Sequence, residues 1–142
     1  MNAIINSQHP AVSWFLVFSG LFFLLVFALP LLFVPLTWAT WFRWPLPEPG
    51  DKRHQGLMNL ATYFGRCTGG LALVILVFIF RAVPDPVGHL SIFEWMAGVA
   101  WVLTFTHAWG AIRRTQPWTE DAEILLYGGT AVIVTWLRCT LT

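Results

Sequence analysis

Three ionisable residues of the sequence, Arg66, His107 and Glu123, lie within or at the edge of long apolar segments. Ionisable side chains at membrane depth are energetically costly, and they usually face the protein interior and pair with one another. Tyr63 shares a helical face with Arg66, and Tyr127 shares one with Glu123. We therefore expect an Arg66–Glu123 ion pair, with His107 and the two tyrosine hydroxyls nearby.

The chemistry of this predicted polar cluster has two interpretations. In the functional one, the cluster binds a lipid head-group, a quinone or another small ligand, or it handles protons. In the structural one, it is a buried polar clamp that fixes the register of the helices. The structural interpretation is favoured, because Arg, Tyr and Glu also collect at helix ends for interfacial reasons. No residue is assigned a catalytic role.

The histidines and cysteines give little support for a metal or haem. His107 is the one histidine well inside an apolar segment, and His54 is its only weak partner for a haem. Cys67 and Cys139 form no CxxC or Cys/His metal spacing. HExxH, GxSxG and P-loop patterns are also missing from the sequence. The sequence thus predicts no metal and no cofactor, and it argues against an enzyme; a haem or a quinone is kept as an alternative.

Composition identifies the setting of these residues as a membrane. Of the 142 residues, 57% are hydrophobic and only 11% are charged, whereas a soluble domain carries about 25% charged residues. The net charge of +1 gives no reason to expect nucleic acid as a partner. The nine Trp are typical of chains that anchor at the water–lipid interface.

Hydropathy predicts an all-α fold: one transmembrane domain, residues 1–142, built as a four-helix bundle with short loops. A span needs about 20 mostly apolar residues. Pro30 should kink the first span and Pro35 should end it. A Trp-rich interfacial belt and a Pro/Gly loop then precede the second span. The predicted spans cover residues of about 11–36, 57–83, 92–112 and 121–140.

The distribution of Lys and Arg predicts the orientation. With four spans, both termini and the second connecting turn lie on one side of the membrane. That side holds two basic residues and the other side holds six, which favours the latter as cytoplasmic. We therefore expect both termini on the non-cytoplasmic side. The two groups are Arg81 and Arg138 on one side, and Arg43, Lys52, Arg53, Arg66, Arg113 and Arg114 on the other.

Small residues form a stripe in the second span. Ala61, Gly65 and Gly69 are four residues apart and fall on one helical face. Such a stripe lets another helix approach closely. The stripe is predicted to pack a helix, either of this chain or of a partner.

The fourth span is short for its charges. Fourteen residues separate Glu123 from Arg138, about 21 Å of helix at about 1.5 Å per residue. The hydrocarbon core is about 30 Å thick. Arg138 can extend outward, but the shorter Glu123 is expected to need a polar partner.

In outline, the chain resembles small bacterial four-helix membrane proteins of the DoxX-like kind. The resemblance consists of a long uncharged first helix, a Trp/Pro loop, and a second helix that carries Gly65, Arg66 and Gly69. It implies the helical layout, and no functional residue follows from it.

The favoured functional hypothesis is a non-catalytic accessory or assembly subunit of a larger membrane-embedded complex, respiratory or photosynthetic, in the bacterial inner membrane. Its expected partners are membrane lipids and other membrane subunits or further copies of the chain. The alternative is a small intramembrane enzyme, or a redox, quinone-binding or lipid-binding protein, that uses the polar cluster in the cytoplasmic half of the bundle. A transporter or channel subunit ranks last, because no inverted repeat is evident.

Overall fold

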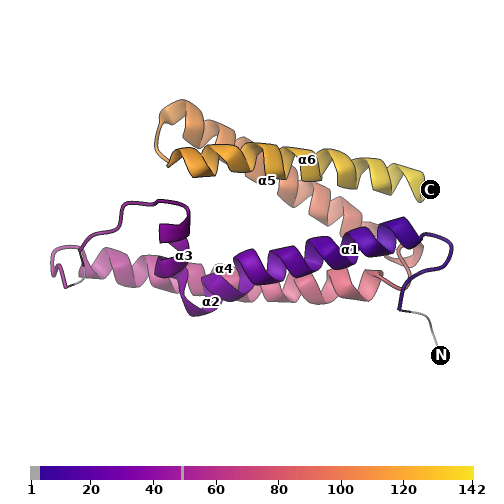
Figure 1. The fold of residues 1–142 in the computed structure, drawn as a ribbon, viewed down its shortest axis with the longest axis horizontal. Coiled ribbons are helices and arrows are strands. Elements are labelled where there is room, and N and C mark those ends of the chain that lie inside the picture. The colour runs from indigo at the N-terminus through magenta and orange to yellow at the C-terminus, as the bar shows by residue number, and fades with distance from the viewer. Residues whose placement is uncertain (1–3, 49) are drawn as a thin grey trace. The chain divides into compact units, whose positions relative to one another are not determined.

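The computed structural model describes residues 4–48 and 50–142, and these residues form helices and connecting segments without a strand. Figure 1 shows the order of the elements. They are α1 (Pro10–Phe23), a π-helical stretch (Leu24–Ala28), α2 (Leu29–Phe33), α3 (Pro35–Trp41), α4 (Gln55–Ala82), a short 3-10 turn (Val87–His89), α5 (Leu90–Arg113) and α6 (Trp118–Thr140).

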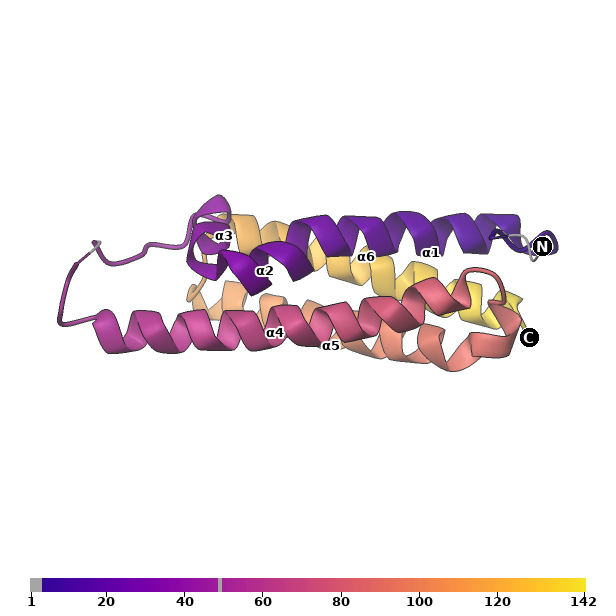
Figure 2. The same ribbon diagram turned by 90° about the horizontal axis from the view of Figure 1, so that it is seen from below.

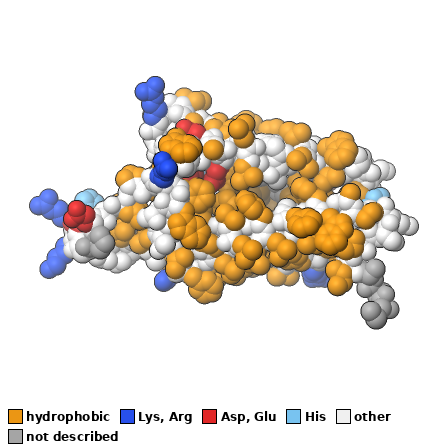
Figure 3. Space-filling model, viewed as in Figure 1, with side chains coloured by type: hydrophobic (Ala, Val, Ile, Leu, Met, Phe, Trp, Pro, Cys, Tyr) orange, Lys and Arg blue, Asp and Glu red, His pale blue; other side chains and the backbone are white. Residues whose placement is uncertain are grey.

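Four helical segments are long and apolar enough to cross a membrane, which confirms the predicted all-α fold of an integral membrane protein. Hydrophobic side chains are spread widely over the face seen in Figure 3, between areas of backbone and other side chains, as expected for a surface that meets lipid. The side of the membrane on which the termini lie stays a prediction. The segments are Pro10–Phe33, Gln55–Ala82, Val87–Arg113 and Trp118–Thr140.

The chain divides into two compact units, and each is described by itself. Unit 1 comprises the described residues of Met1–Val17 together with Ile79–Thr142, and unit 2 comprises those of Phe18–Phe78. Helices α1 and α4 each begin in one unit and continue into the other.

In unit 2, Pro30 interrupts the helical hydrogen bonds of the first span, and the Trp38 side chain supplies a donor in their place. Proline has no N–H, so the carbonyl four residues earlier, that of Val26, loses its helical partner. The backbone around it widens into the π-helical stretch, a common response to such a defect. The Trp38 indole Nε1–H donates to the Val26 carbonyl at 2.7 Å. The freed acceptor is thereby satisfied within the chain.

Pro35 ends the first span, as predicted, and it also begins a new helix. Val34 leaves the helical conformation, with φ −135° and ψ 53°, and Pro35 occupies the first turn of α3, where its missing N–H has no cost. Trp38 belongs to the Trp-rich segment predicted as an interfacial belt, and its position at an interface stays a prediction. Its ring packs within an aromatic group, with its centroid 4.7 Å from that of Phe42 and 5.9 Å from that of Phe27.

The small-residue stripe of α4 meets the first span within unit 2. A Cβ built on Gly69 would lie 2.5 Å from the backbone nitrogen of Leu32, and one built on Gly65 would lie 2.5 Å from the Cβ of Pro35. Only glycine permits backbones to approach this closely. Ala61, the third member of the predicted stripe, is exposed.

In unit 1, the N-terminal segment is tied to the turn that follows α4. The Ser13 hydroxyl is fully buried and donates to the Val83 carbonyl at 2.6 Å. The Asn6 side-chain amide donates to the Pro84 carbonyl at 3.0 Å. These two hydrogen bonds satisfy backbone carbonyls that have no helical partner, because they lie in the proline-rich turn after α4.

Helices α5 and α6 pack side by side and antiparallel (Figures 1 and 2). At the open end of this hairpin, the Arg138 guanidinium pairs with the Glu94 carboxylate through two hydrogen bonds, of 3.0 and 3.1 Å. The buried positions of α6 are spaced by three residues or, between Glu123 and Ala131, by eight, which is about two helical turns, so they define one packed face. They are Glu120, Glu123, Ala131, Val134 and Leu137. Two carboxylates therefore belong to that buried face.

Candidate functional site

A polar cluster lies near the turn that joins α5 and α6. The His107 Nε2 atom, from the next-to-last turn of α5, is 3.1 Å from Glu120 Oε2 and 3.4 Å from Glu123 Oε2. Glu120 and Glu123 are three residues apart in the first two turns of α6, so both carboxylates point to the same side of that helix. We call His107, Glu120 and Glu123 the His–Glu cluster.

The His–Glu cluster is withdrawn from the surface. The side chains of His107, Glu120 and Glu123 are 13%, 9% and 8% exposed. The second carboxylate oxygen of Glu123, Oε1, is buried and has no hydrogen-bond partner among the described residues. A buried acceptor in that condition costs free energy, so this atom calls for an explanation.

The other ring nitrogen of His107 fixes its tautomer. Nδ1 lies 2.8 Å from the backbone carbonyl of Leu103. A carbonyl oxygen only accepts, so Nδ1 carries a hydrogen and donates it. In the neutral ring, Nε2 then presents a lone pair. That lone pair would face carboxylate oxygens, which are also acceptors. The ring therefore either carries a second proton and donates to them, or shares with them a positively charged or hydrogen-donating group.

The connecting turn holds the ends of both helices in place. The Gln116 amide donates to the His107 carbonyl at 3.0 Å and to the Asp121 carboxylate at 2.9 Å. Arg114 takes a left-handed conformation, φ 51°, where α5 ends. Gly110 leaves room for the Gln116 side chain, because a Cβ at this position would collide with it. The turn thereby sets the distance between His107 and the start of α6.

The start of α6 favours acidic side chains. Glu120 and Asp121 lie in its first turn, where the helix dipole stabilises negative charge. Tyr127 lies one turn beyond Glu123 and interacts with its carboxyl group. The Tyr127 ring packs 5.1 Å from that of His107. An aromatic wall thus closes one side of the His–Glu cluster.

The structure brings together three of the five residues of the predicted cluster: His107, Glu123 and Tyr127. Arg66 and Tyr63 belong to unit 2, where both are exposed. The Arg66–Glu123 ion pair stays a prediction. The described polar partner of Glu123 from the neighbouring helix is His107.

Glu120 is the cluster residue that the sequence reading missed. As an acid in the first turn of a helix, it is accounted for by the helix dipole alone. Its spacing held a further signal, because Glu120, Glu123 and Tyr127 follow the three- and four-residue steps that continue to Ala131 and Val134. An acid on the apolar face of a helix is expected to be buried and paired.

His54, the other weak haem candidate, lies on the loop before α4. Its Nδ1 is 2.7 Å from the Asp51 carboxylate, and both side chains are substantially exposed. The hydrogen bond from His54, aided by one from the Arg53 amide, lowers the pKa of Asp51 below its ordinary value. His54 and His107 belong to different units, so a shared haem stays a prediction, as does a quinone.

Cation-binding chemistry is available from the His–Glu cluster itself. One ligand atom from each of His107, Glu120 and Glu123 can be chosen so that all three lie within 4.8 Å of one another. No metal site was predicted from the sequence, because the spacing of His107 and the two acids follows no metal-binding motif. Their proximity arises from the hairpin.

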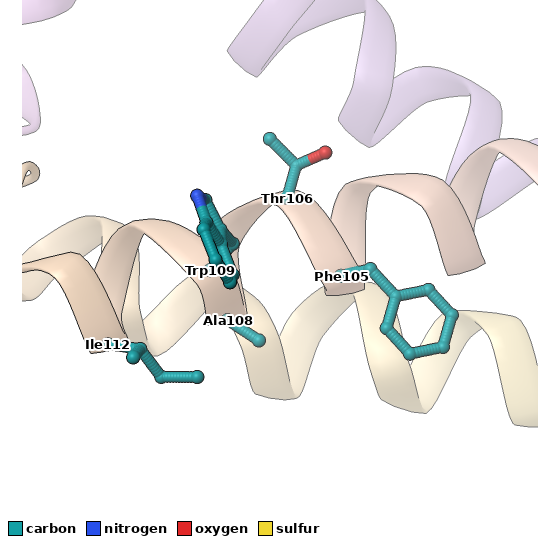
Figure 4. Close-up of a pocket in the computed structure, with 5 residues that line it drawn as sticks. All are labelled: Phe105, Thr106, Ala108, Trp109 and Ile112. Carbon is teal, nitrogen blue, oxygen red and sulfur yellow. The ribbon is translucent and has the colours of Figure 1, made fainter.

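The outer face of α5 is apolar and open. A shallow hollow of about 520 Å³ lies on this helix. Figure 4 shows residues that line it, with the Phe105 and Ile112 side chains pointing away from the ribbon. Trp95, Phe105, Trp109 and Ile112 are 64–74% exposed. Arg113 lies over the Trp109 ring, 5.7 Å from its centroid. Such a face suits lipid or another membrane helix.

Comparison with known proteins supplies no family for this architecture: no protein-family model, curated protein sequence or solved structure matches the chain.

Proposed function

We propose that the chain is a small ligand-binding protein of the bacterial inner membrane, which holds a positively charged or hydrogen-donating group in the His–Glu cluster. This was the alternative hypothesis from sequence. The observation that carries it is the surplus of acceptors, since His107 Nε2 faces two carboxylates and Glu123 Oε1 has no hydrogen-bond partner among the described residues.

A purely structural clamp would use its acceptors fully, because unsatisfied buried polar atoms cost about 1–3 kcal/mol each. A ligand that donates to Glu123 Oε1, or carries positive charge, removes that cost on binding. Suitable classes are a metal cation, an amine-bearing lipid head-group and the hydroxyl of a reduced quinone. Binding alone accounts for the geometry, and no catalytic role is assigned.

The test is to purify the protein from its own membranes in mild detergent and to identify what is bound. An absorption spectrum reports pigment or quinone, mass spectrometry of the denatured sample reports small molecules, and elemental analysis reports metals. We expect one compound or ion per chain in the wild type and in Glu94→Gln, and its loss in Glu123→Gln. Glu94 is the matched control, since it is an acid of the same hairpin that pairs with Arg138.

Equal contents in wild type and Glu123→Gln, or nothing bound in either, would contradict the proposal. The circular dichroism spectrum of Glu123→Gln, compared with that of the wild type, ensures that loss of the ligand is not loss of the fold.

The accessory-subunit hypothesis remains a second candidate, favoured by the exposed aromatic face of α5. It predicts that other membrane subunits copurify in fixed proportion, and that replacing Trp109 with Ser releases them. A solitary monomer in gentle detergent would count against it. The two functions are compatible, because the His–Glu cluster and the outer face lie on different sides of α5.

A further inference from the structure

The ligand of the His–Glu cluster can be narrowed by its geometry, an inference that rests on the proposed ligand-binding function. Nε2 of His107 approaches Glu120 Oε2 at 3.1 Å and Glu123 Oε2 at 3.4 Å. Ligand atoms about 2.0–2.2 Å from a tetrahedral zinc ion lie about 3.3–3.6 Å from one another. The two distances from His107 therefore come near those of a coordination sphere, and all three ligand atoms lie within 4.8 Å of one another.

The orientation of His107 is that of a metal ligand. Metal-binding histidines usually donate their second N–H to a carbonyl or carboxylate, which fixes the ring and leaves the other nitrogen as a donor to the metal. His107 does this through Nδ1 and the Leu103 carbonyl at 2.8 Å. Its backbone carbonyl in turn accepts from Gln116 at 3.0 Å, so both the ring and its backbone are held.

Glu123 supplies an independent indication of a missing partner. Its side chain is 8% exposed, and Oε1 is buried without a hydrogen-bond partner among the described residues. A carboxylate that binds a metal through both oxygens would use this atom. A carboxylate that only accepted a hydrogen bond from His107 would leave it unused.

The donor set restricts the class of ion. Imidazole nitrogen suits zinc, iron, copper and nickel, whereas carboxylate oxygen suits magnesium, calcium and manganese. One imidazole with two carboxylates fits ions that accept both, and no cysteine belongs to the set. Three protein ligands also leave coordination positions open for water or a further ligand.

We propose that His107, Glu120 and Glu123 form a binding site for a divalent transition-metal ion, of the zinc, manganese or iron(II) kind, between α5 and α6. Two helices each contribute to this site, so the ion joins them near their connecting turn. Gln116 and Tyr127 are positioning residues, since Gln116 holds the backbone at His107 and Tyr127 packs against the His107 ring.

The test uses the full chain, purified in mild detergent with a tag that lacks histidine and stripped of metals by a chelator. Zinc or manganese ions are then titrated by calorimetry, and bound metal is counted by elemental analysis. We expect one ion per chain in the wild type. The affinity should fall on the order of 100-fold or more in His107→Gln and Glu123→Gln, because loss of an outer-shell partner alone costs about 10–100-fold.

Two variants of the same hairpin region serve as matched controls. His89→Gln and Glu94→Gln change the same residue types outside the cluster and should bind as the wild type does. Circular dichroism and elution from a sizing column check that each variant is folded. Zinc should also raise the unfolding temperature of the wild type and leave that of Glu123→Gln unchanged.

X-ray absorption of the zinc-loaded protein detects the atoms bound to the metal, a signal that a purely structural role of the cluster would not produce. We expect nitrogen and oxygen neighbours at about 2.0–2.2 Å, with an imidazole signal that His107→Gln abolishes. Equal affinity in wild type and cluster variants, or no binding at one ion per chain, overturns the metal site. If the wild type instead contains a bound lipid head-group or quinone that is missing from Glu123→Gln, the metal inference fails while the proposed ligand-binding function stands.

Discussion

The two units of the chain hold their helices together by different means. In unit 2, Gly65 and Gly69 of α4 let the backbone of the first span approach until a Cβ would no longer fit. In unit 1, α6 buries apolar residues such as Ala131 and Val134. Polar side chains join it to α5 in addition, at His107 near one end and at the Arg138–Glu94 pair near the other.

The difference shows where each kind of contact is of use. Lipid gives no hydrophobic force between helices, so close van der Waals packing of small residues is the ordinary way to join them. Buried ionisable groups are costly there. Among the described residues, the buried ionisable side chains Glu120 and Glu123 belong to the hairpin that carries the proposed site, which favours a role beyond packing for the His–Glu cluster.

The largest expected effect is that of His107→Leu in unit 1. It removes the group that both carboxylates contact and leaves buried acceptors without that partner, at an expected cost of about 1–3 kcal/mol for each of them. The free energy of unfolding is measured by circular dichroism during titration with a denaturing detergent. His54→Leu, at the exposed histidine–acid pair, should cost less than about 1 kcal/mol. Equal losses would remove the distinction between the two pairs.

In unit 2, Gly69→Ala should destabilise by about 1–3 kcal/mol, because its methyl group would meet the backbone of Leu32 and Ala28. Gly70→Ala is the matched control, since a Cβ there meets nothing within 4 Å. Its helix should gain about 0.5–1 kcal/mol from the lost flexibility of glycine. The same unfolding measurement compares the two variants. A Gly69→Ala protein as stable as Gly70→Ala would contradict close packing of α4 against the first span.

Trp38→Phe tests how unit 2 tolerates Pro30. The ring is kept and the Nε1–H is lost, so the Val26 carbonyl loses its donor, at an expected cost of about 1–2 kcal/mol. Trp41→Phe changes an exposed neighbour on α3 and should be nearly neutral. If Pro30→Ala is introduced as well, the helix regains its own N–H, and most of the cost of Trp38→Phe should disappear. Additive losses would show that the two residues are not coupled.

The smallest effect concerns Asp51, outside the spans. Its pKa is lowered by the His54 hydrogen bond from an ordinary value of 3.8. A carboxyl group with a lowered folded-state pKa stabilises the fold above its unfolded pKa and loses that contribution as the pH falls through the folded value. Titration of the Asp51 carboxyl carbon by NMR should show its pKa rising toward the ordinary value in His54→Ala. An unchanged pKa would show that the pair does not persist in solution.

The number and position of the spans follow from the sequence, because membrane helices are long, apolar and separated by charged or Pro/Gly-rich segments. Pro35 could be foreseen as the end of the first span for the same local reason. Helix α3 could not, because its seven residues pack through Trp38 against aromatic residues that the sequence alone does not place beside it.

The candidate site was less predictable. The burial of His107 and Glu123 could be inferred from their depth in apolar segments, but their pairing depends on the turn that sets α5 against α6. That turn rests on the Gln116 hydrogen bonds and the left-handed Arg114. Glu120 lies in a first turn, where acids are common because of the helix dipole, so its type and position alone did not indicate its burial or its partner.

During synthesis, α5 leaves the ribosome before α6, and this order bears on how the acidic start of α6 enters the bilayer. Glu120, Asp121 and Glu123 all lie in its first two turns, and acidic residues in an inserting helix oppose insertion. With His107 and Gln116 already in place, these carboxylates reach the membrane beside groups that can receive them. Helix α6 is therefore expected to insert as the second arm of a hairpin, and a chain with α5 replaced by an inert span should leave it outside.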